Sequence, residues 1–307
     1  MAVAAGLLWL ATRGVDWPTL TAAVQGASWS WIAAAVALTA VDRILMAWRW
    51  LSLLRGVEAN RPLRSWPLLR VFFVSTFVGT FLPGSVGGDA VRTVAASRQG
   101  VSLANAAASV AIDRLLGTLS VLLMAVAGLW FIGAELDAPQ LLPLALLGSV
   151  VAGTVTALLL FKPGAYERAL RLARTHRLPV VDRLARKFLA ASSQYGARHG
   201  LVARVLGASV VVQILRTLQT WCLGMALGLT VSVAWYFAAI PVIVLIVLLP
   251  ISFAGLGTAN VAFRVLFGLA GVPETDAFAL SVLFLALSVL GNVPGGLLVA
   301  TGSRKSG

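Results

Sequence analysis

The chain has 307 residues, of which 59% are hydrophobic and 11% are charged, and its mean hydropathy is +0.93. A soluble domain carries about 25% charged residues, so this composition excludes a soluble globular protein and indicates a polytopic membrane protein. Lys and Arg outnumber Asp and Glu by 24 to 11. Basic cytoplasmic loops explain such an excess in a membrane protein, so we expect no nucleic-acid partner. One cysteine and two histidines predict neither disulfides nor a metal site.

Apolar runs predict the membrane helices. A transmembrane helix needs about 20 apolar residues. Five runs reach a spanning length: 28–51, 104–132, 140–161, 202–227 and 275–301. A run at residues 1–11 is shorter, and two more, at 67–82 and 233–249, lead directly into glycine-rich segments. The sequence therefore predicts a single domain, an all-α polytopic integral membrane protein with about eight hydrophobic helices.

Two glycine-rich segments interrupt this apolar sequence. The first is FLPGSVGGDAVR at residues 81–92, and the second is PISFAGLGTAN at residues 250–260. Within a membrane, backbone groups freed from a helix are tolerated only where protein or a water-filled cavity surrounds them. We interpret the two segments as halves of one site.

The charges of the loops predict the face on which each helix ends. Basic residues mark the cytoplasmic face at Arg49, Arg55, Arg61, Arg64, Arg304 and Lys305. Residues 133–139 and 228–232 contain no Lys or Arg and are expected outside. We therefore expect a multi-pass protein of the inner (plasma) membrane with a cytoplasmic C-terminus.

This orientation requires two segments to return to the face from which they enter. Residues 67–98 must return to the inside, and residues 233–271 to the outside. Each is predicted to form a re-entrant or broken-helix hairpin. A pair that enters from opposite faces is typical of an inverted repeat, with a substrate site where the hairpins meet. The alternative is two ordinary loops with turn glycines.

Residues 162–204 form the longest connection and hold ten basic and two acidic residues. Apolar and basic residues alternate along it in a basic amphipathic pattern. Such a pattern suits short helices that lie on an anionic leaflet, with Pro179 separating two of them. A soluble cytoplasmic linker is the alternative interpretation.

Charged residues inside the apolar runs point to function. A charge at the bilayer centre costs at least about 2.5–3.5 kcal/mol, so each needs a partner or a water-filled cavity. Such charges occur at Asp42-Arg43, Asp113-Arg114, Arg216 and Arg264. Neighbours on a helix point about 100° apart, so we expect no pairing within either adjacent couple. Each acid is expected to reach an arginine on another helix.

The charges and the glycine segments together predict an anion-binding cavity. Arg92, Arg114 and Arg216 would hold a phosphate, because the planar guanidinium matches phosphate geometry. Glycines let backbone N–H groups approach an anion, and a helix that starts near Asp89 would aim its positive end there. The candidate substrate-binding residues are Gly84, Gly87, Gly88, Asp89, Arg92, Asp113, Arg114, Arg216, Gly255, Gly257, Asn260 and Arg264.

Two interpretations of the acids stay open. Asp89 and Asp113 would either orient the arginines or exchange protons with them, or the whole network would be structural and lock helices together. Asp89 is also a good helix N-cap. The sequence lacks G-x-S-x-G and G-x-x-x-x-G-K-[ST] motifs, so we expect no enzyme, no catalytic residue, no ATP hydrolysis and no cofactor.

With these residues in place, the sequence resembles the flippase-like family named for the transmembrane domain of lysylphosphatidylglycerol synthase. The resemblance runs over nearly the whole chain. It rests on RW at 49–50, LPGxxGGDxxR at 82–92, SVxxDR at 109–114 with Gly117, PxSxxGLG at 250–257 and NxPGG at 292–296. It implies an eight-helix-class membrane domain associated with moving lipids between leaflets.

Two positions depart from the family pattern. Members commonly carry Arg-Glu where this chain has Ala259-Asn260, and Glu where it has Asp113. In our interpretation Arg264, one turn after the first departure, stands in for the lost charge. The soluble aminoacyl-transfer domain of the two-domain synthases does not follow within the 307 residues, so aminoacylation is not expected.

The sequence thus predicts a lipid translocase, a flippase or facilitator for an anionic phospholipid or a polyprenyl-phosphate-type lipid. Its partners would be lipids with anionic head groups, and a homo-oligomer is compatible with the sequence. The first alternative is a non-transporting scaffold or partner of a glycosyltransferase or another envelope-biosynthesis enzyme. A weaker alternative is an intramembrane enzyme that modifies lipids.

Overall fold

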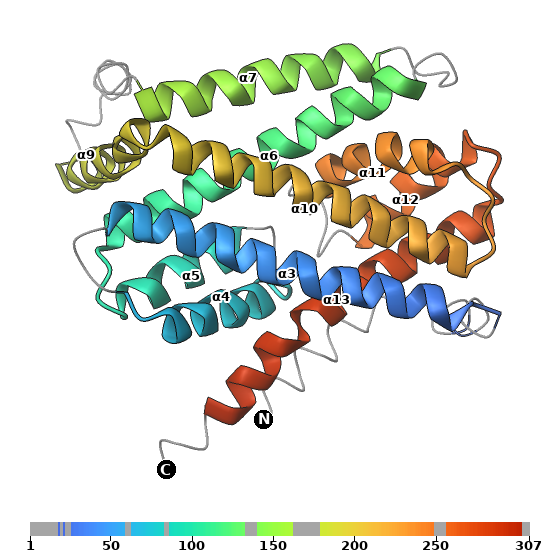
Figure 1. The fold of residues 1–307 in the computed structure, drawn as a ribbon, viewed down its shortest axis with the longest axis horizontal. Helices are drawn as coiled ribbons and strands as arrows, with labels where there is room; N and C mark the ends of the chain where they lie inside the picture. The colour runs from blue at the N-terminus through green and yellow to red at the C-terminus, as the bar shows by residue number, and fades with distance from the viewer. Residues whose placement is uncertain are drawn as a thin grey trace.

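The computed structural model describes residues 18, 21, 26–58, 63–82, 86–132, 140–161, 179–248 and 256–302. The chain in these ranges is helical and contains no strand, which confirms the all-α prediction. The elements, shown in Figure 1, are α3 (Trp29–Val57), α4 (Ser65–Gly79), α5 (Val86–Ser97), α6 (Leu103–Ile132), α7 (Leu141–Phe161), α9 (Pro179–Ser193), η2 (Gln194–Ala197), α10 (His199–Ala226), α11 (Val233–Leu248), α12 (Leu256–Gly268) and α13 (Glu274–Gly302).

Five of the described helices, α3, α6, α7, α10 and α13, are long and apolar enough to cross a membrane. Their bounds match the five predicted spans to within a few residues, except at the end of α3. This helix extends past the apolar run 28–51 to Val57 and includes Arg55. The chain is therefore a multi-pass membrane protein. The apolar run at 1–11 lies outside the described residues.

The shorter apolar helices form two hairpins. α4 and α5 have 15 and 12 residues and pack against each other, as do α11 and α12 with 16 and 13 residues. At 1.5 Å per residue each is shorter than the roughly 30 Å of a bilayer core. These lengths fit the predicted hairpins. Gly84 and Gly255 fall between the paired helices and lie outside the described residues.

The two hairpins begin at opposite ends of the bundle. The long helices α3 and α10 are antiparallel: the Ser28 amide donates to the Ala226 carbonyl at 3.0 Å, and the Tyr195 hydroxyl donates to the Leu53 carbonyl at 3.0 Å. α4 follows the end of α3, and α11 follows the end of α10. One hairpin therefore lies at the left of Figure 1 and the other at the right.

The two halves of the chain, α3–α6 and α10–α13, pack against each other through equivalent pairs of helices. α4 packs against α13, and α11 packs against α6. Each contact uses a glycine on the long helix: Gly295 meets the Phe73 backbone of α4, and Gly128 meets the Phe237 backbone of α11. A Cβ at either glycine would overlap the facing carbonyl oxygen. If α3–α6 is matched helix by helix to α10–α13, α3 corresponds to α10, which runs in the opposite direction. The two halves therefore form an inverted-topology repeat.

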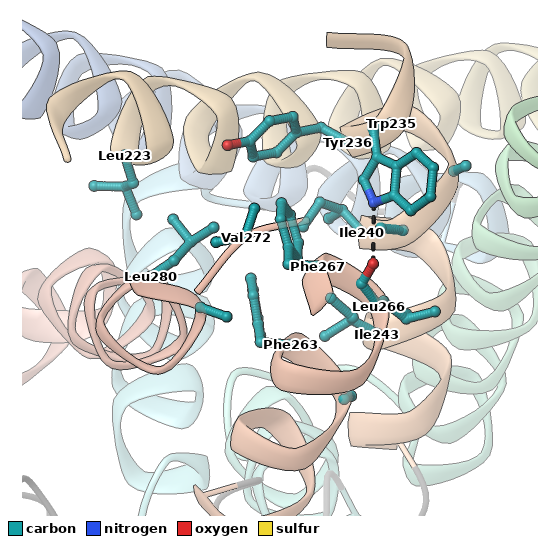
Figure 2. Packing of buried hydrophobic residues seen from close by; sticks show 14 of the residues in the cluster. Leu223, Trp235, Tyr236, Ile240, Ile243, Phe263, Leu266, Phe267, Val272 and Leu280 are labelled. Atoms are coloured by element: carbon teal, nitrogen blue, oxygen red, sulfur yellow. Dashed lines mark hydrogen bonds between the residues drawn. The ribbon is translucent and has the colours of Figure 1, made fainter. Parts of the chain in front are cut away.

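The second hairpin is the centre of the largest described hydrophobic cluster (Figure 2). Tyr236 of α11 meets Phe267 of α12 edge to face at 5.0 Å, and Phe263 stacks on Phe267 at 5.5 Å between ring centroids. The Trp235 indole N–H donates to the Leu266 carbonyl at 3.1 Å, so it is not left unpaired in the core. Apolar packing therefore fixes α11 to α12.

The basic connector is shorter than predicted. Its described part consists of α9 and η2, and α9 packs against α6 and α7. Pro179 is the first residue of α9, where its missing N–H costs no helix hydrogen bond. His199 to Arg204 belong to the first turns of α10, because the helix continues past the apolar run. Residues 162–178 lie outside the described part.

Candidate functional site

A cluster of five charged side chains joins α3, α5 and α6. Its centre is Asp113 of α6, which is 7% exposed. Arg49 Nη2 donates to Asp113 Oδ1 at 2.7 Å and to the Asp113 backbone carbonyl at 3.1 Å. Arg92 Nη1 of α5 lies 3.9 Å from Asp113 Oδ2. Asp113 thus pairs with arginines of two other helices, as the sequence predicted.

Arg92 is buried between the two helices of the first hairpin and is 4% exposed. Its Nε donates to Ser75 Oγ at 3.2 Å and its Nη2 donates to Thr76 Oγ1 at 3.3 Å. Its guanidinium carbon lies 4.6 Å from the Phe72 ring centroid and 5.6 Å from that of Trp50. Hydroxyls and aromatic faces therefore stabilise a cation that a purely apolar site would exclude.

The accessible end of the cluster is the pair between Arg114 and Asp89. Arg114 Nε donates to Asp89 Oδ2 at 2.6 Å, and its Nη2 donates to Asp89 Oδ1 at 2.9 Å. This is the bidentate fork in which a guanidinium also binds phosphate. The Arg114 side chain is 43% exposed, against 16% for Asp89. Asp89 lies in the first turn of α5, which begins at Val86, so the N-cap interpretation is wrong.

The cluster carries an excess of positive charge. Its three arginines face two aspartates in the ion pairs that hold it together. Arg49 Nε is buried and has no hydrogen-bond partner in the described structure. A bound anion would neutralise the excess in a region where the dielectric constant is low.

The glycines of the first hairpin contact protein. A Cβ added at Gly88 would lie 2.9 Å from Gly79 Cα and 3.0 Å from the Ser75 carbonyl oxygen, and one at Gly87 would lie 2.5 Å from Leu82 Cβ. Glycine at these positions lets α5 approach α4 closely enough for Arg92 to reach its hydroxyls. That the backbone N–H groups of these glycines approach a bound anion stays a prediction.

A second polar cluster joins α3 to α10 and α13. Asp42, 1% exposed, lies with Oδ1 3.6 Å from Arg216 Nε and with Oδ2 3.7 Å from Arg43 Nη1. Both arginines also point N–H groups at the Met46 sulfur, at 3.5 Å from Arg43 and 3.1 Å from Arg216.

This second cluster corrects two predictions. Arg43 does pair with its neighbour Asp42, because its long side chain bends back across the 100° between them. Arg216 lies beside Asp42 of α3 and forms its ion pair with this residue, rather than with Asp89 or Asp113, the acids that hold Arg114 and Arg92. The three arginines predicted to share one phosphate are thus divided between two clusters.

The second hairpin contributes no charge to either cluster among its described residues. The Ser281 hydroxyl donates to Asn260 Oδ1 at 2.6 Å. Arg264 forms an ion pair with Glu274, and both side chains are substantially exposed, at 47% and 68%. Gly257 lies in the first turn of α12. Arg264 therefore pairs with an exposed residue rather than with either polar cluster, which does not fit the interpretation that it stands in for a lost charge.

Sequence reasoning missed three members of the site. Arg49 was assigned to the cytoplasmic loops but is 3% exposed. Ser75 and Thr76, which bond Arg92, resemble ordinary small residues of an apolar helix. The sequence did contain one signal, because the small residue Gly117 lies one turn after Asp113. In the structure, a Cβ at Gly117 would be 3.4 Å from Arg49 Nη2, so a glycine there leaves room for the Arg49 side chain.

The guanidinium N–H donors and the excess positive charge of the first cluster suit an anionic ligand. Within the described ranges no group of three His, Cys, Asp or Glu side chains could hold a metal ion. A family model described as lysylphosphatidylglycerol synthase TM region matches residues 1–296. No curated protein matches the chain.

Proposed function

We propose that this chain, which belongs to the lysylphosphatidylglycerol synthase TM-region family, is a lipid translocase of the inner membrane. Family membership and the membrane-spanning helices support a lipid-related function in the envelope. The proposed substrate is an anionic phospholipid or a polyprenyl-phosphate-type lipid. The chain would act without chemical modification of that lipid.

The observation that carries this proposal is the bidentate pair of Arg114 with Asp89, at the accessible end of a buried cluster with excess positive charge. A phosphate offers two oxygens in the same geometry as the Asp89 carboxylate. A lipid phosphate would therefore exchange with Asp89 for the Arg114 fork. Arg49 and Arg92, held by Asp113, would supply the field that stabilises the phosphate away from water.

The test is the accessibility of a fluorescent anionic phospholipid in proteoliposomes that contain the purified protein. A quencher added outside destroys the signal of the outer leaflet at once, and translocation exposes the remainder. We expect the wild-type protein to expose the inner-leaflet lipid and Arg114→Gln to lose this activity. Arg70→Gln is the matched control, because Arg70 is an exposed arginine of α4 that lies outside both polar clusters and donates to the Leu298 carbonyl.

If wild type, Arg114→Gln and empty vesicles give the same signal with several anionic lipids, the translocase proposal is wrong. The scaffold interpretation, a partner of a glycosyltransferase or another envelope enzyme, would then replace it. A chemically altered lipid in the same vesicles, detected by mass spectrometry, would instead identify an enzyme.

A further inference from the structure

A basic pocket of about 510 Å³ lies where the end of α3 meets the start of α10. α3 contributes Ser52, Arg55 and Gly56, and the opposite wall includes Arg198, His199 and Arg204. No acidic residue belongs to its lining. The pocket is separate from the Arg114 fork, which lies on α6.

The three arginines of this pocket keep most of their donors. Arg55 Nη2 donates to Ser65 Oγ at 2.6 Å, and Arg204 Nε donates to the Gly200 carbonyl at 3.2 Å. None of the three has an acidic partner among the described residues. A guanidinium has five N–H groups, so donors remain for a ligand. Three like charges around one cavity repel each other, and a bound anion would offset this repulsion.

The start of α10 adds to this potential. α10 is 28 residues long, and no side chain caps its first turn. Its first residues, His199 and Gly200, belong to the lining, so the positive end of the helix dipole lies at the pocket.

Tertiary contacts, rather than a loop, shape the pocket. A Cβ at Gly56 would lie 2.5 Å from Leu201 Cδ2, so α3 and α10 touch directly at its floor. The buried Tyr195 donates to the Leu53 carbonyl at 3.0 Å and fixes η2 against α3, and burial raises the pKa of this hydroxyl, which keeps it a neutral donor. Packing between α3, η2 and α10 therefore holds the walls of this open pocket in place.

An exposed tryptophan at a helix end lies close to the pocket in sequence and in structure. The bond from Arg55 to Ser65 places the pocket beside the start of α4, where Trp66 is 67% exposed. Exposed tryptophans at helix ends are typical of the interface between hydrocarbon and water. A ligand at this level would be the head group of a lipid in the adjacent leaflet.

We propose that this pocket binds the phosphate of an anionic phospholipid head group. Binding requires only the arginines and the start of α10, so it does not depend on transport. Ser52 of its lining lies three residues, less than one helical turn, from Arg49 of the buried cluster. The site would hold an anionic lipid beside Arg49, at the buried end of that cluster.

The experiment measures how much labelled phosphatidylglycerol stays with the purified protein in phosphatidylcholine nanodiscs. Arg198→Gln/Arg204→Gln is expected to lower retention about tenfold, because charge-assisted hydrogen bonds to the phosphate are lost. Ala197→Trp fills the pocket without a change of charge and should lower retention to a similar degree. Arg98→Gln, an exposed arginine outside the pocket at the end of α5, is the matched control and should retain wild-type binding.

Three results would overturn the proposal: wild-type retention in both pocket variants, an equal loss in Arg98→Gln, or equal retention of labelled phosphatidylcholine. Displacement by inorganic phosphate, with no preference for the lipid, would identify a site for free phosphate instead. Arg114→Gln should keep phosphatidylglycerol in the pocket while it loses translocation. The failure of one proposal can therefore be told from the failure of the other.

Discussion

The two hairpins occupy equivalent places in the repeat but bury different kinds of side chain. The first holds the Arg92 guanidinium between hydroxyls and aromatic faces and presents Asp89 to Arg114. The second is held by Tyr236, Phe263 and Phe267 (Figure 2). The same backbone arrangement therefore supports an ionic site in one half and an apolar core in the other. Under the proposed function, the first hairpin would therefore contact the substrate and the second would support the first.

This difference accounts for one departure from the family pattern. Ala259 is 0% exposed and Asn260 accepts a hydrogen bond from Ser281. An arginine at 259 would need space and an acidic partner that the described surroundings do not supply. At these two positions the second hairpin is held by packing and one neutral hydrogen bond.

The largest effect is expected for Asp113→Asn. It removes the charge that balances Arg49 and Arg92, and breaking a buried pair in this way costs about 3–5 kcal/mol. We expect a value near the lower end, because Arg49 keeps its bond to the backbone carbonyl. The measurement is unfolding in detergent, followed by the fluorescence of the tryptophans. A loss no larger than that of Asp89→Asn, at the accessible pair, would contradict the buried role of Asp113.

The two interhelical glycines should behave alike, although the hairpins differ in chemistry. Leucine at Gly128 or at Gly295 would force its side chain into the backbone of the opposite half, and such overpacking costs about 1–3 kcal/mol. Gly207 of α10 is the control, because a Cβ there meets nothing within 4 Å. Similar losses at both sites would support the equivalence of the two halves. A loss at one alone would show that the halves are not equivalent.

How far the sequence could predict this structure depends on the range of the interaction. Run lengths and loop charges predicted the spanning helices and both hairpins, because each depends on local composition. They could not predict that Arg216 joins Asp42 whereas Arg49 joins Asp113, since both choices depend on how α3 rotates against its neighbours. Arg43 shows the same limit: helix geometry gave the direction of its Cβ, but a long flexible side chain still reached Asp42.

The smallest effect is expected for Asn260→Ala. Asn260 supplies one neutral acceptor to the Ser281 hydroxyl, and that hydroxyl also donates to the Phe278 carbonyl at 2.6 Å. A typical neutral hydrogen bond contributes about 0.5–1.5 kcal/mol, and the remaining acceptor keeps the hydroxyl from being unpaired. We therefore expect a loss of about 1 kcal/mol or less and unchanged lipid translocation. If Asn260→Ala instead abolished translocation while unfolding stayed near wild type, Asn260 would contact the substrate. The second hairpin would then share the transport chemistry with the first.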